Sequence, residues 1–285
     1  MSRRYSAASA STASIGIKAA AAAPLLILVT AILAAAAVIT PSFAFTAFKS
    51  SCPSKSSLAR HAATIKSIET INLSDTQSSA ISSAKQQINQ AITANQPHSE
   101  ILSHLTHLES LSPLTSPARH PLMDGPWVVL YTDAPPPSNG QLGIFQGVAK
   151  QVIDLDGGTY KNELYVGGKG RDGDEGAWLS AVLEATWSEW DGRFLDSLDT
   201  TTTTATTAAS SNNVDYGATT WKVDFVSLTL SIFQLPIFTQ KFQEGTARTW
   251  KMTYLDEETR IVRAGKTGRE EDDWIFYMRR GERKG

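Results

Sequence analysis

The chain is short of cysteine, of histidine in its second half, and of acidic residues at its start. Its single cysteine is Cys52, and the last of its five histidines is His120. From residue 121 onward there is therefore no thiol nucleophile, no imidazole base for a serine nucleophile and no usual zinc ligand. These absences disfavour hydrolase and zinc chemistry in that part, and a lone cysteine excludes a disulfide within the chain.

Acidic residues are missing until Glu69, although seven Lys or Arg residues precede it. Of the 26 basic residues in the chain, 19 remain from Glu69 onward, and they face all 28 acidic residues. The net charge of −2 thus combines a basic leader with a body of net charge −9. An acidic body argues against a nucleic-acid partner, because phosphates are neutralised by Lys and Arg.

The basic leader begins with the pattern of a secretory signal peptide. Basic residues at its start precede an apolar stretch from Pro24 to Thr40. Ser42 and Ala44 then occupy the small-residue positions of a cleavage site before Phe45. We therefore predict that residues 1–44 are a removable signal peptide.

Residues 45–66 form a second part of the leader, which is rich in serine, basic and free of acid. That composition is typical of a transit peptide. Cys52 lies in this segment, so the mature protein would contain no cysteine. The alternative for the apolar part of the leader is a transmembrane anchor, because Ala19 to Ile39 is just long enough to span a bilayer.

The body divides into a helical part and a β-rich part. In residues 67–120 the apolar spacing predicts one or two helices, followed by a Pro-rich linker. Residues 121–285 contain all seven tryptophans and short strand-like runs separated by Gly, Pro and Asp clusters. Eight or so strands at this spacing indicate a mainly β sandwich or barrel. The Thr-rich stretch 199–213 has no apolar residue to pack beyond alanine, so we interpret it as a disordered loop insertion.

One long strand predicts a bend. In Trp221 to Phe233 the apolar residues change face near Phe225 and Val226. A β-bulge or sharp bend at that point would bring both halves onto one face, as closed barrels require.

The end of the chain reads as a three-stranded meander. Apolar alternation in Thr249–Leu255 is interrupted at Asp256, whose carboxylate can bond backbone amides of a turn. A second strand starts at Arg260, Gly265 marks the next turn, and a third apolar run follows it.

Three motif-like patterns in the body are weak. The Gly168-x-Gly170-x-x-Gly173 sequence matches a dinucleotide fingerprint, but the acidic residues beside it would repel a pyrophosphate, and the segment after it alternates like a strand. The same acidic turn lacks the glutamate that a calcium loop needs. His104 and His107 have helical metal-ligand spacing but no evident third ligand. The sequence therefore predicts no metal and no cofactor.

What remains is apolar and aromatic surface inside a β domain. A small barrel either fills its interior with side chains or holds one small ligand there, and sites for apolar ligands are lined mainly by apolar and aromatic groups. The candidate ligand-lining residues are Trp127, Tyr131, Trp221, Trp250 and Tyr254. The alternative is that these aromatics are only core.

Several stretches resemble the plastid lipid-associated proteins, or plastid fibrillins. They are "LMDGPWVVLYTDAPP" (122–136), "FQGVAKQVIDLDGGTYKN" (145–162) and "TYLDEETRIVRAGKTG" (253–268). The two-part leader is similar to the presequences of algae with secondary plastids. The resemblance implies a lipocalin-like antiparallel barrel in a plastid, on plastoglobules, on thylakoids or in stroma. It further implies non-covalent binding or transport of quinones, carotenoids or fatty acids, with no catalytic residues.

The resemblance also points to residues with a structural role, namely Gly125, Thr132, Asp256, Arg260 and Gly265. We expect Asp256 and Arg260 to pair across the turn and fix the hairpin beside the barrel mouth, although ligand contact is an equal alternative. Two other functions stay open: an enzyme acting on an apolar substrate in the barrel, and a structural coat protein that binds lipid bodies through its surface.

Overall fold

The computed structural model describes Glu69 and residues 71–193, 214–269 and 271–283. By internal contacts the chain divides into residues 1–49 and 50–285, and all described residues belong to the second unit. The predicted signal peptide, the predicted transit segment with Cys52, and the Thr-rich stretch 199–213 lie outside the described residues.

Two α-helices precede the strands, as predicted. They are α3, Asp75–Thr93, and α4, His98–Ser110. The side chain of Ser74 caps α3 by accepting a hydrogen bond from the backbone N–H of Gln77 at 3.2 Å. Each helix buries a stripe of apolar residues spaced three or four apart, namely Ile81, Ala84, Ile88 and Ala91 in α3 and Ile101, Leu105 and Leu108 in α4.

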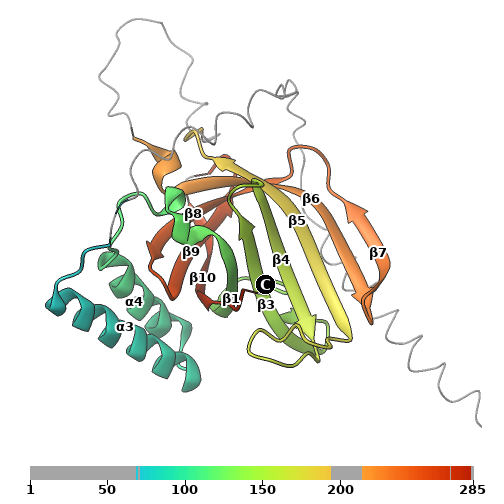
Figure 1. The fold of residues 1–285 in the computed structure, drawn as a ribbon, viewed down its shortest axis with the longest axis horizontal. Coiled ribbons are helices and arrows are strands. Elements are labelled where there is room, and N and C mark those ends of the chain that lie inside the picture. Colours follow the sequence, from blue (N-terminus) through green and yellow to red (C-terminus); the bar gives the residue numbers. More distant parts are fainter. Residues whose placement is uncertain (1–68, 70, 194–213, 270, 284–285) are drawn as a thin grey trace, which may run out of the picture. The chain divides into compact units, whose positions relative to one another are not determined.

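Ten strands follow in the described part of the chain, all paired antiparallel. Their bounds are β1 Gly125–Thr132, β2 Gln141–Leu142, β3 Phe145–Asp154, β4 Thr159–Val166, β5 Leu179–Glu189, β6 Thr220–Ile232, β7 Leu235–Lys241, β8 Ala247–Leu255, β9 Thr259–Lys266 and β10 Asp272–Arg280. Eight of them form a ring in the order β1-β10-β9-β8-β6-β5-β4-β3, and pairing of β1 with β3 closes it (Figure 1). The mainly β fold with a closed antiparallel barrel is therefore confirmed.

The predicted bend in β6 is a β-bulge at Val226. Ala185 of β5 pairs with Phe225 and the preceding Glu184 pairs with Ser227, so Val226 has no partner in the register. The bulge places Leu228 on the same inner face as Phe225, which leaves Val226 itself 48% exposed. On one side of the bulge β6 pairs with β8, and on the other side it pairs with the added strand β7.

The molecule has two apolar cores, one on each face of the barrel wall. The inner core lies inside the ring and includes Trp127, Trp221, Trp250 and Phe276. The outer core lies between the helices and the outer faces of β8, β9 and β10, where the helical stripes pack against residues that include Ile261. The helices thus cover the wall on the outside and contribute none of the buried residues of the inner core.

A segment before β1 closes one end of the ring. It carries the short 3-10 helices η1, Pro117–Arg119, and η2, Pro121–Met123, and its residues Leu114, Ala118 and Met123 belong to the inner core. Arg119 anchors this end by ion pairs at 2.6 Å to both Glu189 and Asp215, the latter next to η4, Tyr216–Ala218.

Candidate functional site

The three predicted tryptophans meet inside the barrel. Trp127, Trp221 and Trp250 are at most 5% exposed, and Trp221 pairs directly with Trp250 across β6 and β8. Trp250 lies 5.3 Å from Tyr160 and 5.2 Å from Phe276, measured between ring centroids. The interior is thus lined by aromatic side chains from widely separated strands.

The two predicted tyrosines lie on the outer face instead. Register shifts at Leu130 in β1 and at Thr253 in β8 each insert one extra residue, so the alternation changes face before Tyr131 and before Tyr254. Both tyrosines pack in the outer core against the helices. The Tyr131 hydroxyl lies 2.6 Å from Nδ1 of His98, at the start of α4. The structure therefore brings Trp127, Trp221 and Trp250 together and places Tyr131 and Tyr254 apart from them.

Three inward-facing residues on neighbouring strands are only partly buried, so this part of the inner face is accessible to solvent. Asn162 of β4 pairs with Leu183 of β5, and Phe225 of β6 pairs with Ala185, two residues farther along β5. Leu183 and Phe225 pack on the inner core, yet both remain partly accessible, as does Asn162. We call these three residues the opening.

Polar side chains also lie next to Asn162 on the inner face of the barrel. The hydroxyl of Tyr160, which is 2% exposed, donates to Oδ1 of Asn162 at 2.6 Å. Gln151 of β3, the register partner of Asn162, and Arg260 of β9 are each 1% exposed, and Nη2 of Arg260 donates to Oε1 of Gln151. Sequence reasoning missed Gln151, Tyr160 and Asn162, although a polar residue on the inward face of an otherwise apolar strand is a readable signal.

Arg260 is the most unusual of these groups. Its guanidinium carbon lies 5.2 Å from the centroid of the Trp127 ring, and its Nε has no hydrogen-bond partner in the described part of the chain. Burial lowers the pKa of Arg260 to about 9, and the neighbouring charge of Arg280 adds to that effect. Burial also raises the pKa of Tyr160, so its hydroxyl stays protonated and available as a donor.

The expected pairing of Asp256 with Arg260 is wrong. Arg260 points into the barrel, whereas Asp256 follows the outward-facing Tyr254 on the helix side. The carboxylate of Asp256 accepts hydrogen bonds from the backbone N–H groups of Glu258 and Thr259 and forms an ion pair with Lys85 of α3 at 2.7 Å. Its role in the turn is therefore confirmed, but its charged partner comes from the helix, on the opposite face of the wall.

The remaining predicted structural residues lie at strand ends. Gly125 opens β1 with φ of +100°, a conformation that favours glycine. The hydroxyl of Thr132 accepts from the backbone N–H of Ala134 at 3.0 Å, just after β1 ends. Gly265 lies within β9, paired with Asp272, and not in the turn where it was expected; a Cβ on it would lie 2.9 Å from the backbone oxygen of Glu271.

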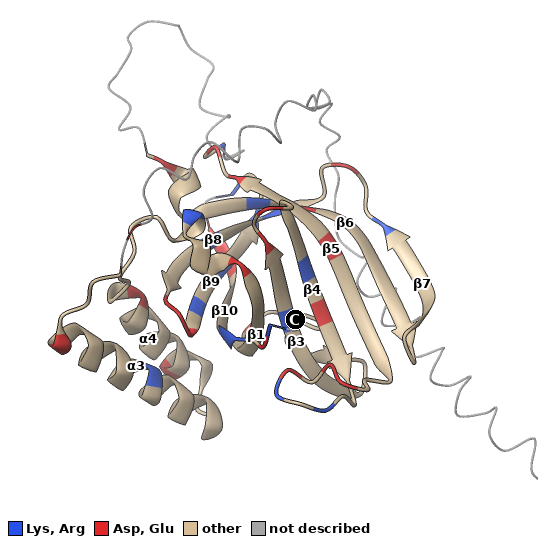
Figure 2. Cartoon of the chain, in the orientation of Figure 1, with Lys and Arg blue, Asp and Glu red and all other residues tan. Residues whose placement is uncertain are grey.

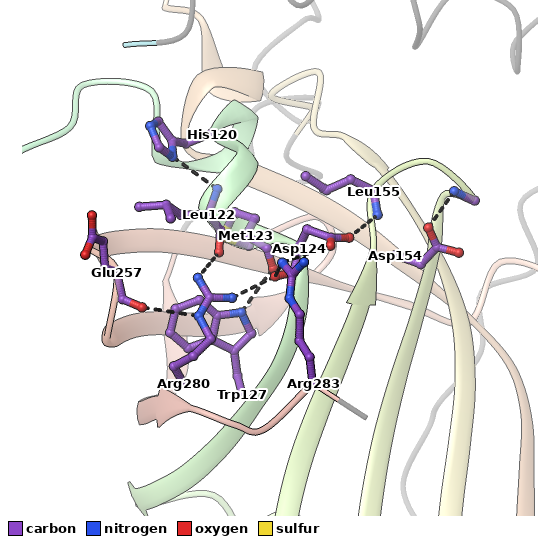
Figure 3. Close-up of polar contacts among 11 residues, drawn as sticks. His120, Leu122, Met123, Asp124, Trp127, Asp154, Leu155, Glu257, Arg280 and Arg283 are labelled. Atoms are coloured by element: carbon purple, nitrogen blue, oxygen red, sulfur yellow. Dashed lines mark hydrogen bonds and ion pairs between the residues drawn. The ribbon is translucent and has the colours of Figure 1, made fainter. Parts of the chain in front are cut away.

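A second arginine closes the barrel end over Trp127 (Figure 3). The guanidinium carbon of Arg280 lies 3.8 Å from the Trp127 ring centroid, and its nitrogens donate to the backbone carbonyls of Leu122, Asp124 and Glu257. The indole N–H of Trp127 donates to the Met123 carbonyl at 3.0 Å. These contacts of Arg280 connect β1, β10, η2 and the β8–β9 turn. Arg280 was not identified from the sequence.

Within the described part, no group of three or more His, Cys, Asp or Glu side chains is placed to hold a metal ion. Neither α3 nor α4 combines the length and the apolar character that a membrane-spanning helix requires. No protein-family model matches the chain, and no curated protein matches it. A closed β-barrel of this kind is compatible with binding of a small apolar molecule in its interior.

Proposed function

We propose that the chain is a lipid-binding protein that holds one apolar molecule inside its barrel without covalent chemistry. The observation that carries this proposal is the partial exposure of Asn162, Leu183 and Phe225 on the inner face of the barrel, whose core includes Trp127, Trp221 and Trp250. Sites for apolar molecules combine such a lining with a few placed polar groups, here supplied by Tyr160 and Asn162 among others.

The resemblance to plastid lipid-associated proteins supports a more specific form of the proposal. In that form the ligand is a quinone, a carotenoid or a fatty acid, and the protein works in a plastid at plastoglobules, thylakoids or stroma. N-terminal sequencing of the protein from its host tests the targeting part, because removal of residues 1–44 yields no fragment that begins before Phe45. An intact Met1 in a membrane fraction would instead indicate an anchor.

The binding proposal is tested by incubating the purified full-length chain with a plastid lipid extract and identifying what co-purifies by mass spectrometry. A discrete lipid in stoichiometric amount is the expected result. Recovery of no lipid contradicts the proposal. Chemical conversion of the bound lipid over time would favour an enzyme acting in the barrel.

A second candidate, a coat protein of lipid bodies, is favoured by exposed apolar side chains at two hairpin tips. At the β6–β7 tip Phe233 is 72% and Leu235 is 70% exposed, and at the β2–β3 tip Ile144 is 88% exposed. Trp178 joins the tips, because its carbonyl accepts from the backbone N–H of Phe233 at 2.7 Å and its ring lies 5.2 Å from that of Phe145. We call Ile144, Phe233 and Leu235 the apolar tips.

The apolar tips lie in stretches without charge. Residues 134–149 and 226–240 contain no Lys, Arg, Asp or Glu. Lys241 is the last residue of β7, and Figure 2 shows that β7 is otherwise uncharged. Side chains of this kind fit the apolar surface of a lipid layer better than the charged surface of a soluble partner. We expect the full-length chain to float with galactolipid vesicles in a density gradient. The double variant Phe233→Ser, Leu235→Ser should not float with them. The control is Val214→Ser, which removes an apolar residue that is 59% exposed elsewhere; equal flotation of all three proteins would count against the coat.

A further inference from the structure

Arg260 carries a charge that the protein itself does not neutralise. The side chain is 1% exposed, its Nη2 donates to the neutral amide of Gln151 and lies 3.3 Å from the sulfur of Met278, and its Nε has no partner in the described part. No described carboxylate forms an ion pair with it. An isolated buried charge is costly, and buried charges are ordinarily paired.

A second guanidinium makes the same region more positive. Arg280 lies over the Trp127 ring, with its guanidinium carbon 3.8 Å from the ring centroid, and Arg260 lies 5.2 Å from it. The contacts of Arg280 are with backbone carbonyls, which are neutral. Two cations therefore lie beside one indole, with no described carboxylate in ion-pair contact with either.

The surroundings define what kind of anion would fit. The opening is bordered by the apolar side chains of Leu183 and Phe225, and the polar groups of Asn162 and Tyr160 lead inward from it. The neighbours of Arg260 include Gln151, Met278 and the ring of Trp127. A molecule with a long apolar body and a single compact anionic end would meet an apolar lining along its body and a hydrogen-bond donor at its end.

We propose that Arg260 binds the carboxylate of a long-chain carboxylic acid inside the barrel, which makes a fatty-acid-like anion the ligand class. The inference rests on the proposed function and narrows it. Nε of Arg260 is the unpartnered donor for one carboxylate oxygen, whereas the single hydroxyl hydrogen of Tyr160 is already donated to Asn162. A neutral acceptor such as an alcohol would accept a hydrogen bond but would leave the charge uncompensated, so the site should discriminate between the two.

The test compares hexadecanoic acid with hexadecan-1-ol, which has the same chain length but no charge. Binding to the full-length protein is measured by quenching of tryptophan fluorescence at neutral pH, below the lowered pKa of Arg260 of about 9. We expect the acid to bind at least about tenfold more tightly than the alcohol, the factor that one hydrogen bond to a charged group supplies. Arg260→Met should remove this preference while leaving the affinity for the alcohol within a few-fold.

The matched control is Arg263→Met, which removes the same residue type from the same strand. Arg263 lies on the outer face of β9, where it pairs with Glu109 of α4 at 2.7 Å, so its loss should lower stability but keep the acid preference. Arg260→Lys, which keeps the positive charge, should retain part of the preference. Melting temperatures of all variants show whether each is folded.

The outcomes separate this inference from the proposed function. If the wild-type protein binds neither the acid nor the alcohol, the proposed function fails. If it binds both equally, or if Arg260→Met keeps the tenfold preference, lipid binding survives and the carboxylate site is overturned. If Arg260→Met does not fold, the acid preference of the wild type and its reduction in Arg260→Lys still decide the question.

Discussion

The carboxylate of Asp256 stabilises the turn between β8 and β9 by accepting from four donors. Oδ1 of Asp256 accepts from the backbone N–H groups of Glu258 and Thr259 at 2.9 and 2.8 Å. Oδ2 accepts from the Tyr254 hydroxyl at 2.5 Å and from Nζ of Lys85 at 2.7 Å. Asp256→Ala would remove all four interactions, although the β8 and β9 ladders on either side would remain.

The magnitude follows from what each donor loses. The side chain of Tyr254 is 0% exposed, so leaving its hydroxyl unpaired costs about 1–3 kcal/mol in the free energy of unfolding. The amides of the turn can turn to water, and each contributes ~0.5 kcal/mol, at the low end for a hydrogen bond. The ion pair with Lys85 adds up to ~1 kcal/mol. We expect Asp256→Ala to lower stability by about 3 kcal/mol, and Asp256→Asn, which keeps an oxygen for the amides, by about 1 kcal/mol.

Urea unfolding followed by tryptophan fluorescence measures these losses, provided that the slope against urea is unchanged. Glu258→Ala is the control, because that carboxylate is 86% exposed and 3.8 Å from Lys85, and its loss should change stability by less than ~0.5 kcal/mol. If Asp256→Ala unfolds at the same urea concentration as the wild type, this account of the turn is refuted. The double variant with Arg260→Met should be additive to within ~0.5 kcal/mol, because the two side chains lie on opposite faces of the wall.

Three further predictions concern the frame of the barrel. Arg280→Met should lower the free energy of unfolding by about 2–4 kcal/mol, because backbone carbonyls that now accept from the guanidinium lose a charged donor; thermal melting checks this, and an unchanged melting temperature contradicts it. Gly147→Ala should be strongly destabilising, since its Cβ would lie 2.2 Å from the backbone oxygen of Tyr165; normal yield and wild-type melting would show that β3 and β4 can separate there. A hydrogen bond from Arg119 lowers the pKa of Asp215 below its ordinary 3.8, so this carboxylate stabilises the fold above that pH and loses its contribution as the pH falls through the lowered pKa. The melting temperature of Asp215→Asn should therefore lie below that of the wild type at neutral pH and converge with it in acid; a constant gap would argue against the pair.

Much of the architecture could be predicted because it depends on local patterns. Apolar alternation identified the strands, the face change near Val226 identified the bulge, and the spacing of Ile88 and Leu105 within their stripes identified the helices. Ring closure by β1 and β3 could not be derived, because it depends on which distant strands meet and no local pattern encodes that. The same holds for the helices, whose packing partners are on β8, β9 and β10.

The site was predicted only in part for a related reason. Single-residue bulges at Leu130 and Thr253 change the face of every residue beyond them, and neither carries a glycine or another local signal. Tyr131 and Tyr254 therefore fall outside the barrel. Alternation in the sequence predicts which residues of a strand face the barrel interior, but a single inserted residue reverses that assignment for the rest of the strand.

The central claim is that an apolar molecule enters the barrel through the opening, and filling that opening tests it most directly. Leu183→Trp would place a larger side chain there, and Val182→Trp puts the same side chain on the outer face of the same strand. Affinity for hexadecanoic acid is measured for both by displacement of a fluorescent fatty acid, with melting temperature as the check of folding. The account predicts that Leu183→Trp loses about tenfold or more in affinity, a typical effect of blocking a buried contact surface, while Val182→Trp binds like the wild type. Equal and undiminished affinity in a folded Leu183→Trp variant would mean that the ligand does not pass through or occupy this opening.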